Sequence, residues 1–179
     1  NCAILSYALD ISSFDCSNIG ANTVRLFVLD VSGNATSATA IVTVEDNTAP
    51  TVVTKNIIIQ LDANGTASIT AADVNDGSSD NCAIASYALD KTSFDCSNLE
   101  DDNIVTLTVT DVHGNTASAT ATVNVEDNIN PTATTQNITV QLDANGTASI
   151  LAADINNGSA DNCAILSYAL DISSFDCSN

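Results

Sequence analysis

The chain has 179 residues, of which 22 are acidic and three are basic, and its formal net charge is −19. Binding to nucleic acid or to an anionic membrane surface begins with cationic side chains, so this composition excludes both classes of partner. The hydrophobic fraction of 45% and its ordered alternation predict a folded chain. No apolar run is long enough for a membrane span, so we expect no membrane insertion in this segment and any export signal outside it.

The first eighteen residues, NCAILSYALDISSFDCSN, are identical to residues 162–179. LDANGTASI occurs at 61–69 and 142–150, and VEDN occurs at 44–47 and 125–128. Self-similarity at a fixed period is typical of repeat architectures. It predicts the C-terminal part of one repeat at 1–47, a complete repeat at 48–128 and the N-terminal part of a third at 129–179. Both chain ends fall inside a repeat, so we expect a window on a longer periodic protein.

Within the complete repeat, apolar residues alternate with polar ones, as in strands with one buried face. Ile57, Ile59 and Leu61 form one such run, and Ile138–Leu142 is its counterpart in the third repeat. Val105, Leu107 and Val109 face inward in a second run, and a third covers 117–125. Turn signals lie between the runs at 62–65, 76–77 and 113–115. About seven strands in about 80 residues predict an all-β fold of tandem immunoglobulin-like antiparallel β-sandwiches.

Six cysteines recur with a fourteen-residue step as Cys2/Cys16, Cys82/Cys96 and Cys163/Cys177. Residues 84–89 and 94–97 are predicted to form a hairpin that turns at 90–93, which would place Cys82 opposite Cys96. We therefore predict one local disulfide per repeat, worth about 3 kcal/mol in the chain-entropy model, and an oxidising, extracellular setting. Free buried thiols are the weaker alternative, and zinc is disfavoured because the chain has one histidine and no CxxC motif.

Three motifs resemble one family of modules: the TDxxGN turn with Asp111, Gly114 and Asn115, the SDN that contains Asp80, and the VEDNTAP junction. They are similar to the hyalin-repeat and bacterial immunoglobulin-like modules of giant cell-surface adhesins. Among these, their sequences most resemble the SprB-like gliding-motility adhesins, which are exported by type IX secretion. The resemblance implies a structural stalk or filament segment at the cell surface. Its expected partners are the neighbouring repeats of the same chain, other chains of the same kind that bundle with it, and a surface or glycan receptor.

Acidic and amide side chains gather around the predicted repeat junctions, where carboxylates would repel one another unless a cation joined them. Calcium binds carboxylate, amide and carbonyl oxygens, and the junctions resemble the calcium-binding linkers of adhesins and cadherins. We therefore expect interdomain Ca²⁺, with solvated charge that serves solubility as the alternative. A further acidic run lies at 100–102. The candidate ligands are Glu45, Asp46, Asn47, Asp73, Asp76, Asp80, Asp111, Glu126, Asp127, Asn128, Asp154 and Asp161.

Catalysis finds little support in the sequence. His113 is the only histidine, its counterpart in the preceding repeat is Ser32, and the chain has no glycine-rich phosphate loop. We expect a structural role that provides reach and stiffness for cell adhesion or gliding motility. In one alternative the repeats bind polysaccharide, with Tyr7, Tyr87 and Tyr168 as a sugar-stacking row, although such residues on strands are more often core or half-core. In the other, the repeats are accessory domains of a secreted enzyme.

Overall fold

The computed structural model describes residues 3–99 and 102–178. Strands account for most of its regular structure, which confirms the all-β class. Contacts between residues divide the chain into two compact units. The first comprises 1–53, 76–88 and 108–119, and the second comprises 54–75, 89–107 and 120–179. This division does not test the repeat boundaries, and the three-repeat organisation stays a prediction.

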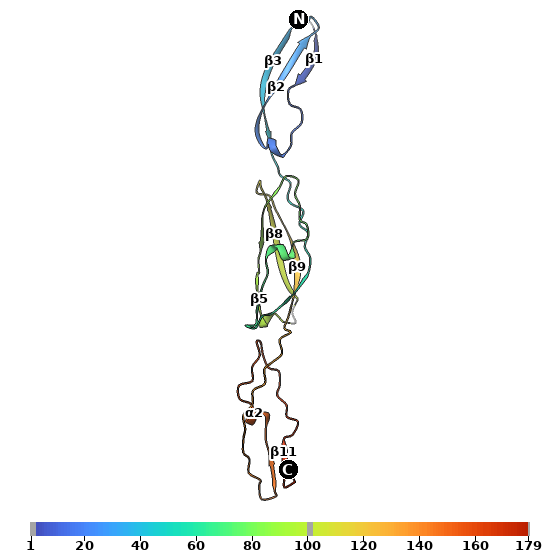
Figure 1. Ribbon diagram of the computed structural model, residues 1–179. Coiled ribbons are helices and arrows are strands. Elements are labelled where there is room, and N and C mark those ends of the chain that lie inside the picture. The colour runs from blue at the N-terminus through green and yellow to red at the C-terminus, as the bar shows by residue number, and fades with distance from the viewer. Residues whose placement is uncertain (1–2, 100–101, 179) are drawn as a thin grey trace. The chain divides into compact units, whose positions relative to one another are not determined.

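In the first unit, β1 (Ile4–Leu9), β2 (Gly20–Asp30) and β3 (Ala35–Val44) form an antiparallel sheet in the order β1-β2-β3 (Figure 1). The turn between β2 and β3 is built by Asp30, whose Oδ1 accepts hydrogen bonds from the N–H groups of Ser32 and Asn34, both at 2.8 Å. A side chain that accepts from the backbone two residues on is the usual signature of an Asx turn. The DxxGN motif is therefore the local cause of the hairpin.

The complete repeat contains a four-stranded sheet in the order β4-β9-β8-β6, formed by β4 (Ile57–Gln60), β9 (Thr116–Glu126), β8 (Asn103–Asp111) and β6 (Ile84–Leu89). Val105, Leu107 and Val109 of β8 are fully buried, as the alternation predicts. Ile58 of β4 is 63% exposed, whereas Leu61, the residue that follows β4, is 4% exposed. β4 and β9 run parallel, so this sheet is not purely antiparallel.

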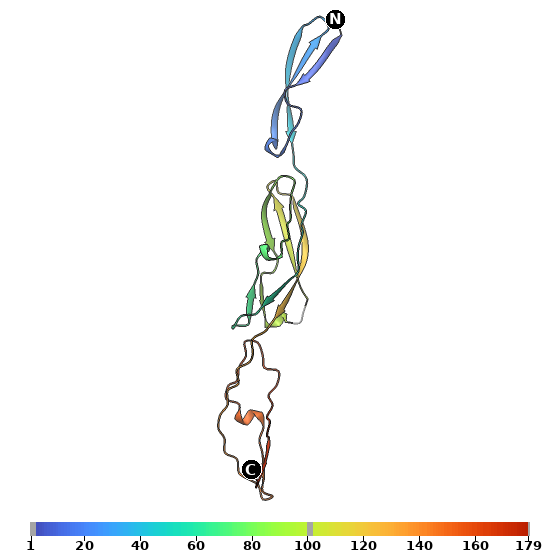
Figure 2. The ribbon, with the colours of Figure 1, turned by 45° about the vertical axis from the view of Figure 1, so that its right-hand side comes forward.

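A second, two-stranded sheet pairs β5 (Thr66–Ser68) with β7 (Ser93–Asp95). β10 (Thr147–Ser149) and β11 (Ser174–Asp176) repeat this pairing. Figure 2 shows that most of the chain around them, drawn in orange to red, is irregular. The predicted hairpin of 84–89 with 94–97 is therefore wrong, because β6 lies in the four-stranded sheet and β7 pairs with β5. The chain changes sheets at 90–92, where Asp90 Oδ1 accepts the Thr106 N–H at 2.8 Å and the Ile69 N–H donates to the Thr92 carbonyl at 2.9 Å.

A short 3₁₀ turn places the second cysteine of the first two fourteen-residue pairs. It covers Cys96–Asn98 directly after β7, and Cys16–Asn18 in the first repeat. In the complete repeat Asp95 Oδ1 accepts the Ser97 N–H at 2.9 Å and Asn98 Oδ1 accepts the Asp95 N–H at 3.0 Å. This reciprocal capping box satisfies donors at the start of the turn, so the DCSN sequence itself sets the local backbone around the cysteine.

The third repeat has less regular structure, with α2 (Ala152–Ile155) as the counterpart of α1 (Ala71–Val74). The strand predicted at Ile138–Leu142 is not formed, and Ile138, Val140 and Leu142 are 39%, 41% and 45% exposed. In the complete repeat the matching strand β4 pairs with β9. The sequence contains no counterpart of β9 for the third repeat, so alternation alone cannot hold this segment as a strand.

Candidate functional site

The cysteines pair across repeats. Cys16 is bonded to Cys82 and Cys96 to Cys163, with sequence separations of 66 and 67 residues. The predicted local pairings Cys2–Cys16, Cys82–Cys96 and Cys163–Cys177 are therefore wrong, because four of the cysteines that they use are bonded elsewhere. Cys177 is an exposed free thiol, and Cys2 lies outside the described residues. The physical reason is the change of sheet at 90–92: Cys82 lies just before β6 and Cys96 just after β7, and these two strands do not pair.

The surroundings of the two disulfides share several contacts. Cys16 Sγ lies 3.6 Å from the Asn81 carbonyl oxygen, and Cys96 Sγ lies 3.6 Å from the Asn162 carbonyl oxygen. The same asparagines contact the VEDN segments: Asn81 Nδ2 donates to Asp46 Oδ1 at 3.2 Å, and Asn162 Nδ2 donates to Asp127 Oδ1 at 3.0 Å. Each repeat junction thus combines a disulfide with an amide–carboxylate hydrogen bond, built from the DCSN, VEDN and DNC motifs.

Gly65 makes room for the second junction. Its φ is +71°, a region that disfavours residues with a side chain, and a Cβ there would lie 2.6 Å from the Asn162 carbonyl oxygen and 2.7 Å from Cys96 Sγ. The DANGT turn therefore requires glycine at this position for two reasons. One is the backbone conformation, and the other is the close approach of the Asn162 carbonyl and the Cys96 sulfur. Sequence reasoning recognised the turn but not the contact.

Three of the predicted ligands come together in the first unit. Asp46, Asp80 and Asp111 each offer a carboxylate oxygen, and these oxygens lie within 4.8 Å of one another. The Asp46 side chain and Asp111 are each 2% exposed, so the cluster is largely shielded from water. His113 Nδ1 lies 3.2 Å from Asp46 Oδ2.

Hydrogen bonds hold two of these carboxylates in the charged form. The Thr48 N–H and then the Asn81 amide hold the pKa of Asp46 below its ordinary value. Burial is the largest influence on Asp111 and raises its pKa, but the side chain and N–H of Asn115 and the N–H of His113 together outweigh it, so the pKa is lowered. Asp46 and Asp111 therefore stay anionic at neutral pH.

The remaining predicted ligands lie elsewhere. Asp73 Oδ2 accepts the Thr70 N–H at 2.7 Å and Asp154 Oδ2 accepts the Leu151 N–H at 2.8 Å, so these two aspartates cap α1 and α2. Asp127 and Asp161 flank the second junction, where Asp161 Oδ2 accepts the Cys163 N–H at 3.0 Å. Glu100 and Asp101 lie outside the described residues. Glu45, Asn47 and Asp76 are exposed, and Glu126 and Asn128 hydrogen-bond to Gln60.

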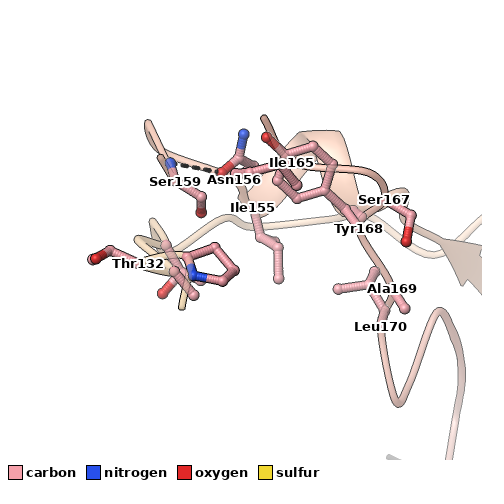
Figure 3. A pocket seen from close by; sticks show the side chains of 13 residues that line it. Thr132, Ile155, Asn156, Ser159, Ile165, Ser167, Tyr168, Ala169 and Leu170 are labelled. Atoms are coloured by element: carbon pink, nitrogen blue, oxygen red, sulfur yellow. Dashed lines mark hydrogen bonds between the residues drawn. The ribbon is translucent and has the colours of Figure 1, made fainter. Parts of the chain in front are cut away.

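An apolar pocket lies in the third repeat, lined by residues that include Pro131, Ile155, Tyr168 and Leu170 (Figure 3). Ile155 is partly exposed, whereas its counterpart in the complete repeat, Val74, is fully buried. The lining of the pocket thus includes a side chain whose counterpart is part of the core, and the pocket gives no support to a ligand site.

The recurring tyrosines are not fully buried. Tyr7, Tyr87 and Tyr168 are 70%, 43% and 50% exposed, so part of each side chain is accessible from solvent. An exposed aromatic ring at the same position of each repeat is the geometry that a sugar-stacking surface requires.

No protein-family model matches the chain, and no curated protein matches it. Within the described residues, no helix has both the length and the apolar character needed to cross a bilayer. Two disulfides are typical of proteins that fold in an oxidising, extracellular or secretory environment.

Proposed function

We propose that the chain is a segment of a structural stalk or filament of a repetitive cell-surface adhesin, in which disulfides between successive repeats bear tension. The observation that carries this proposal is the pairing of Cys16 with Cys82 and of Cys96 with Cys163, which joins the second cysteine of one predicted repeat to the first cysteine of the next. A role in adhesion or gliding motility at the cell surface follows from the adhesin-like motifs.

The pairing has a direct mechanical consequence. Under tension, a disulfide carries the load past the loop that it closes, so the backbone inside the loop cannot extend. At about 3.3–3.6 Å per residue, the two loops together withhold about 450 Å of contour length. Fourteen-residue local loops would withhold far less. A stalk with cross-repeat disulfides therefore keeps its reach even when a repeat unfolds.

The experiment is single-molecule stretching of the 179-residue chain between handles at its two ends, before and after reduction. Reduction should lengthen the fully extended oxidised chain by about 450 Å. Mass spectrometry of unreduced peptides would establish the pairing independently. An increase of only about 145 Å, as three fourteen-residue local loops would give at the same rise per residue, would contradict the proposal.

The exposed tyrosines favour one second candidate, a polysaccharide-binding surface on the repeats. Tyr7, Tyr87 and Tyr168 occupy equivalent positions and all are exposed. A glycan array probed with the intact chain and with the triple Tyr→Ala variant tests this candidate. Binding that the variant loses supports it, and an array without binding to the intact chain removes it.

A further inference from the structure

The chain contains three Asn-Gly sequences, at 64–65, 145–146 and 157–158. Asparagine is a thermolabile residue, and a following glycine, which has no Cβ, lets its backbone nitrogen reach the side-chain amide carbon of the asparagine. In a folded chain, that attack depends on what the glycine N–H and the asparagine amide already contact. Because the three sites share the same two residue types, differences in their reactivity arise mainly from their surroundings.

The first site is held by its own turn. The Gly65 N–H donates to the Asp62 carbonyl oxygen at 2.9 Å, and the Asn64 N–H donates to Asp62 Oδ1 at 2.9 Å. The side-chain amide is held as well, since Asn64 Nδ2 donates to Asp62 Oδ2 at 3.3 Å. Both groups that would react are therefore engaged with one aspartate.

The second site has the same protection. The Gly146 N–H donates to the Asp143 carbonyl oxygen at 3.0 Å, and Asn145 Nδ2 donates to Asp143 Oδ2 at 3.4 Å. The DANGT sequence thus supplies its own brake, because the aspartate that builds the turn also occupies the glycine nitrogen and the asparagine amide.

The third site lacks this protection. Asn157 and Gly158 are both exposed. Among the residues that the structure describes, neither the Gly158 N–H nor the Asn157 side chain has a hydrogen-bond partner, and only the Asn157 N–H is engaged, with the Thr134 carbonyl at 2.9 Å. A Cβ built at Gly158 would meet no atom within 4 Å, so the space around the glycine is open.

We propose that Asn157 is a site of spontaneous deamidation in the folded chain and that Asn64 and Asn145 are protected from this reaction. The Gly158 backbone nitrogen gives up its proton to water and bonds to the side-chain amide carbon of Asn157. The bond from that carbon to the amide nitrogen breaks, and ammonia leaves. Water then opens the cyclic imide at either carbonyl carbon, which yields aspartate or isoaspartate without any oxidant or cofactor.

The two products have different effects on the loop. The N–H of Asn157 donates to Thr134 within a segment, 156–160, that pairs with 132–135. Aspartate leaves this main chain unchanged, and the complete repeat already has Asp76 at the equivalent position. Isoaspartate adds a carbon to the main chain inside the paired segment, so it should weaken the pairing. Deamidation therefore adds a negative charge by one route and loosens the loop by the other.

The test is incubation of the full, oxidised chain at mildly alkaline pH, followed by peptide mass spectrometry and by labelling with an isoaspartyl methyltransferase. Because an ordinary hydrogen bond that must break first slows a reaction about two- to tenfold, Asn157 should deamidate about tenfold faster than Asn64 and Asn145. In concentrated urea, where the turns are lost, the three rates should converge. Equal rates in the folded chain, or a slower rate at Asn157, would overturn the inference.

Two variants identify the cause of the difference. Asp143→Ala removes the carboxylate that holds the Asn145 amide, so it should raise the rate at Asn145 about two- to tenfold, with Asn64 and Asn157 as references in the same molecule. Asn157→Gln has a longer side chain that closes a ring less readily, so most methyltransferase labelling should disappear. An unchanged rate at Asn145, or undiminished labelling of Asn157→Gln, would contradict the inference. None of these results bears on the stretching experiment, which tests the proposed function.

Discussion

Residues 61–98 and 142–179 are nearly the same sequence, but only the first segment has a following strand pair to complete its core. Phe94 is 3% exposed in the complete repeat, and its counterpart Phe175 is only partly buried. Cys96 is in a disulfide, and its counterpart Cys177 is free. Local turns are alike in both segments, whereas burial and cross-linking differ. Each segment therefore forms its turns by itself, whereas its burial and its cross-link depend on neighbouring parts of the chain.

The largest difference is expected from the pair Phe94→Ala and Phe175→Ala. Removing a fully buried phenylalanine side chain costs about 3–5 kcal/mol, because the surrounding atoms do not fill the cavity. Phe175 is partly exposed, so its removal should cost clearly less. Urea unfolding of the two variants and the intact chain measures both values. Equal losses would mean that the third repeat is as well packed as the second.

The next largest difference in the free energy of unfolding is expected between the Cys96→Ser and Cys177→Ser variants. Cys96→Ser removes a cross-link that closes a 67-residue separation, which is worth about 4 kcal/mol in the chain-entropy model. Cys177→Ser removes no described cross-link and should leave the unfolding free energy unchanged. In the intact, unreduced chain, iodoacetamide should label Cys177 and leave Cys96 unmodified. Labelling of Cys96 would contradict the cross-repeat pairing.

The glycine pair sharpens the comparison at the DANGT turn. Gly65 and Gly146 have φ values of +71° and +75°, so alanine at either should cost about 1–3 kcal/mol of backbone strain. At Gly65 the new Cβ would also meet the Asn162 carbonyl. At Gly146 it would meet only the Cys177 sulfur, whose side chain can move. Gly65→Ala should therefore lower the melting temperature more, and the reverse order would argue against the close approach.

The smallest effect is the pH dependence of the same turns, which should not distinguish the two segments. N–H groups of Thr66 and Asn64 hold the pKa of Asp62 below its ordinary value of 3.8, and those of Thr147 and Asn145 do the same for Asp143. As the pH falls through this range, the unfolded carboxyl binds its proton first. The stabilisation is therefore complete above about pH 5 and is lost as the pH falls below about 4.

Urea unfolding between pH 6 and pH 2 measures this dependence. Asp62→Asn and Asp143→Asn should each flatten the curve below pH 4, and by similar amounts. A change confined to Asp62→Asn would show that the turn depends on the junction and not only on its own backbone.

Much of the local structure was predictable. The inward alternation of Val105, Leu107 and Val109, the DxxGN turn at Asp111 and the DANGT turn at Gly65 follow from contacts within a few residues. Of the predicted ligand set, Asp46, Asp80 and Asp111 come together, but Asp73 and Asp154 cap helical turns instead. That difference was not predictable, because a carboxylate that follows a threonine or leucine by three residues can cap a helix or bind a metal ion with the same spacing.

The sequence by itself determined the all-β class, the turns and the period of the repeat, because these depend on side-chain alternation and on backbone preferences of neighbouring residues. Tertiary structure alone decided which cysteines meet. Residues 84–89 and 93–95 enter different sheets, so the fourteen-residue step that pointed to a local bridge instead places each cysteine beside a neighbouring repeat. The number of residues between two cysteines limits how far apart they can lie. Only the pairing of strands decides whether they are in contact.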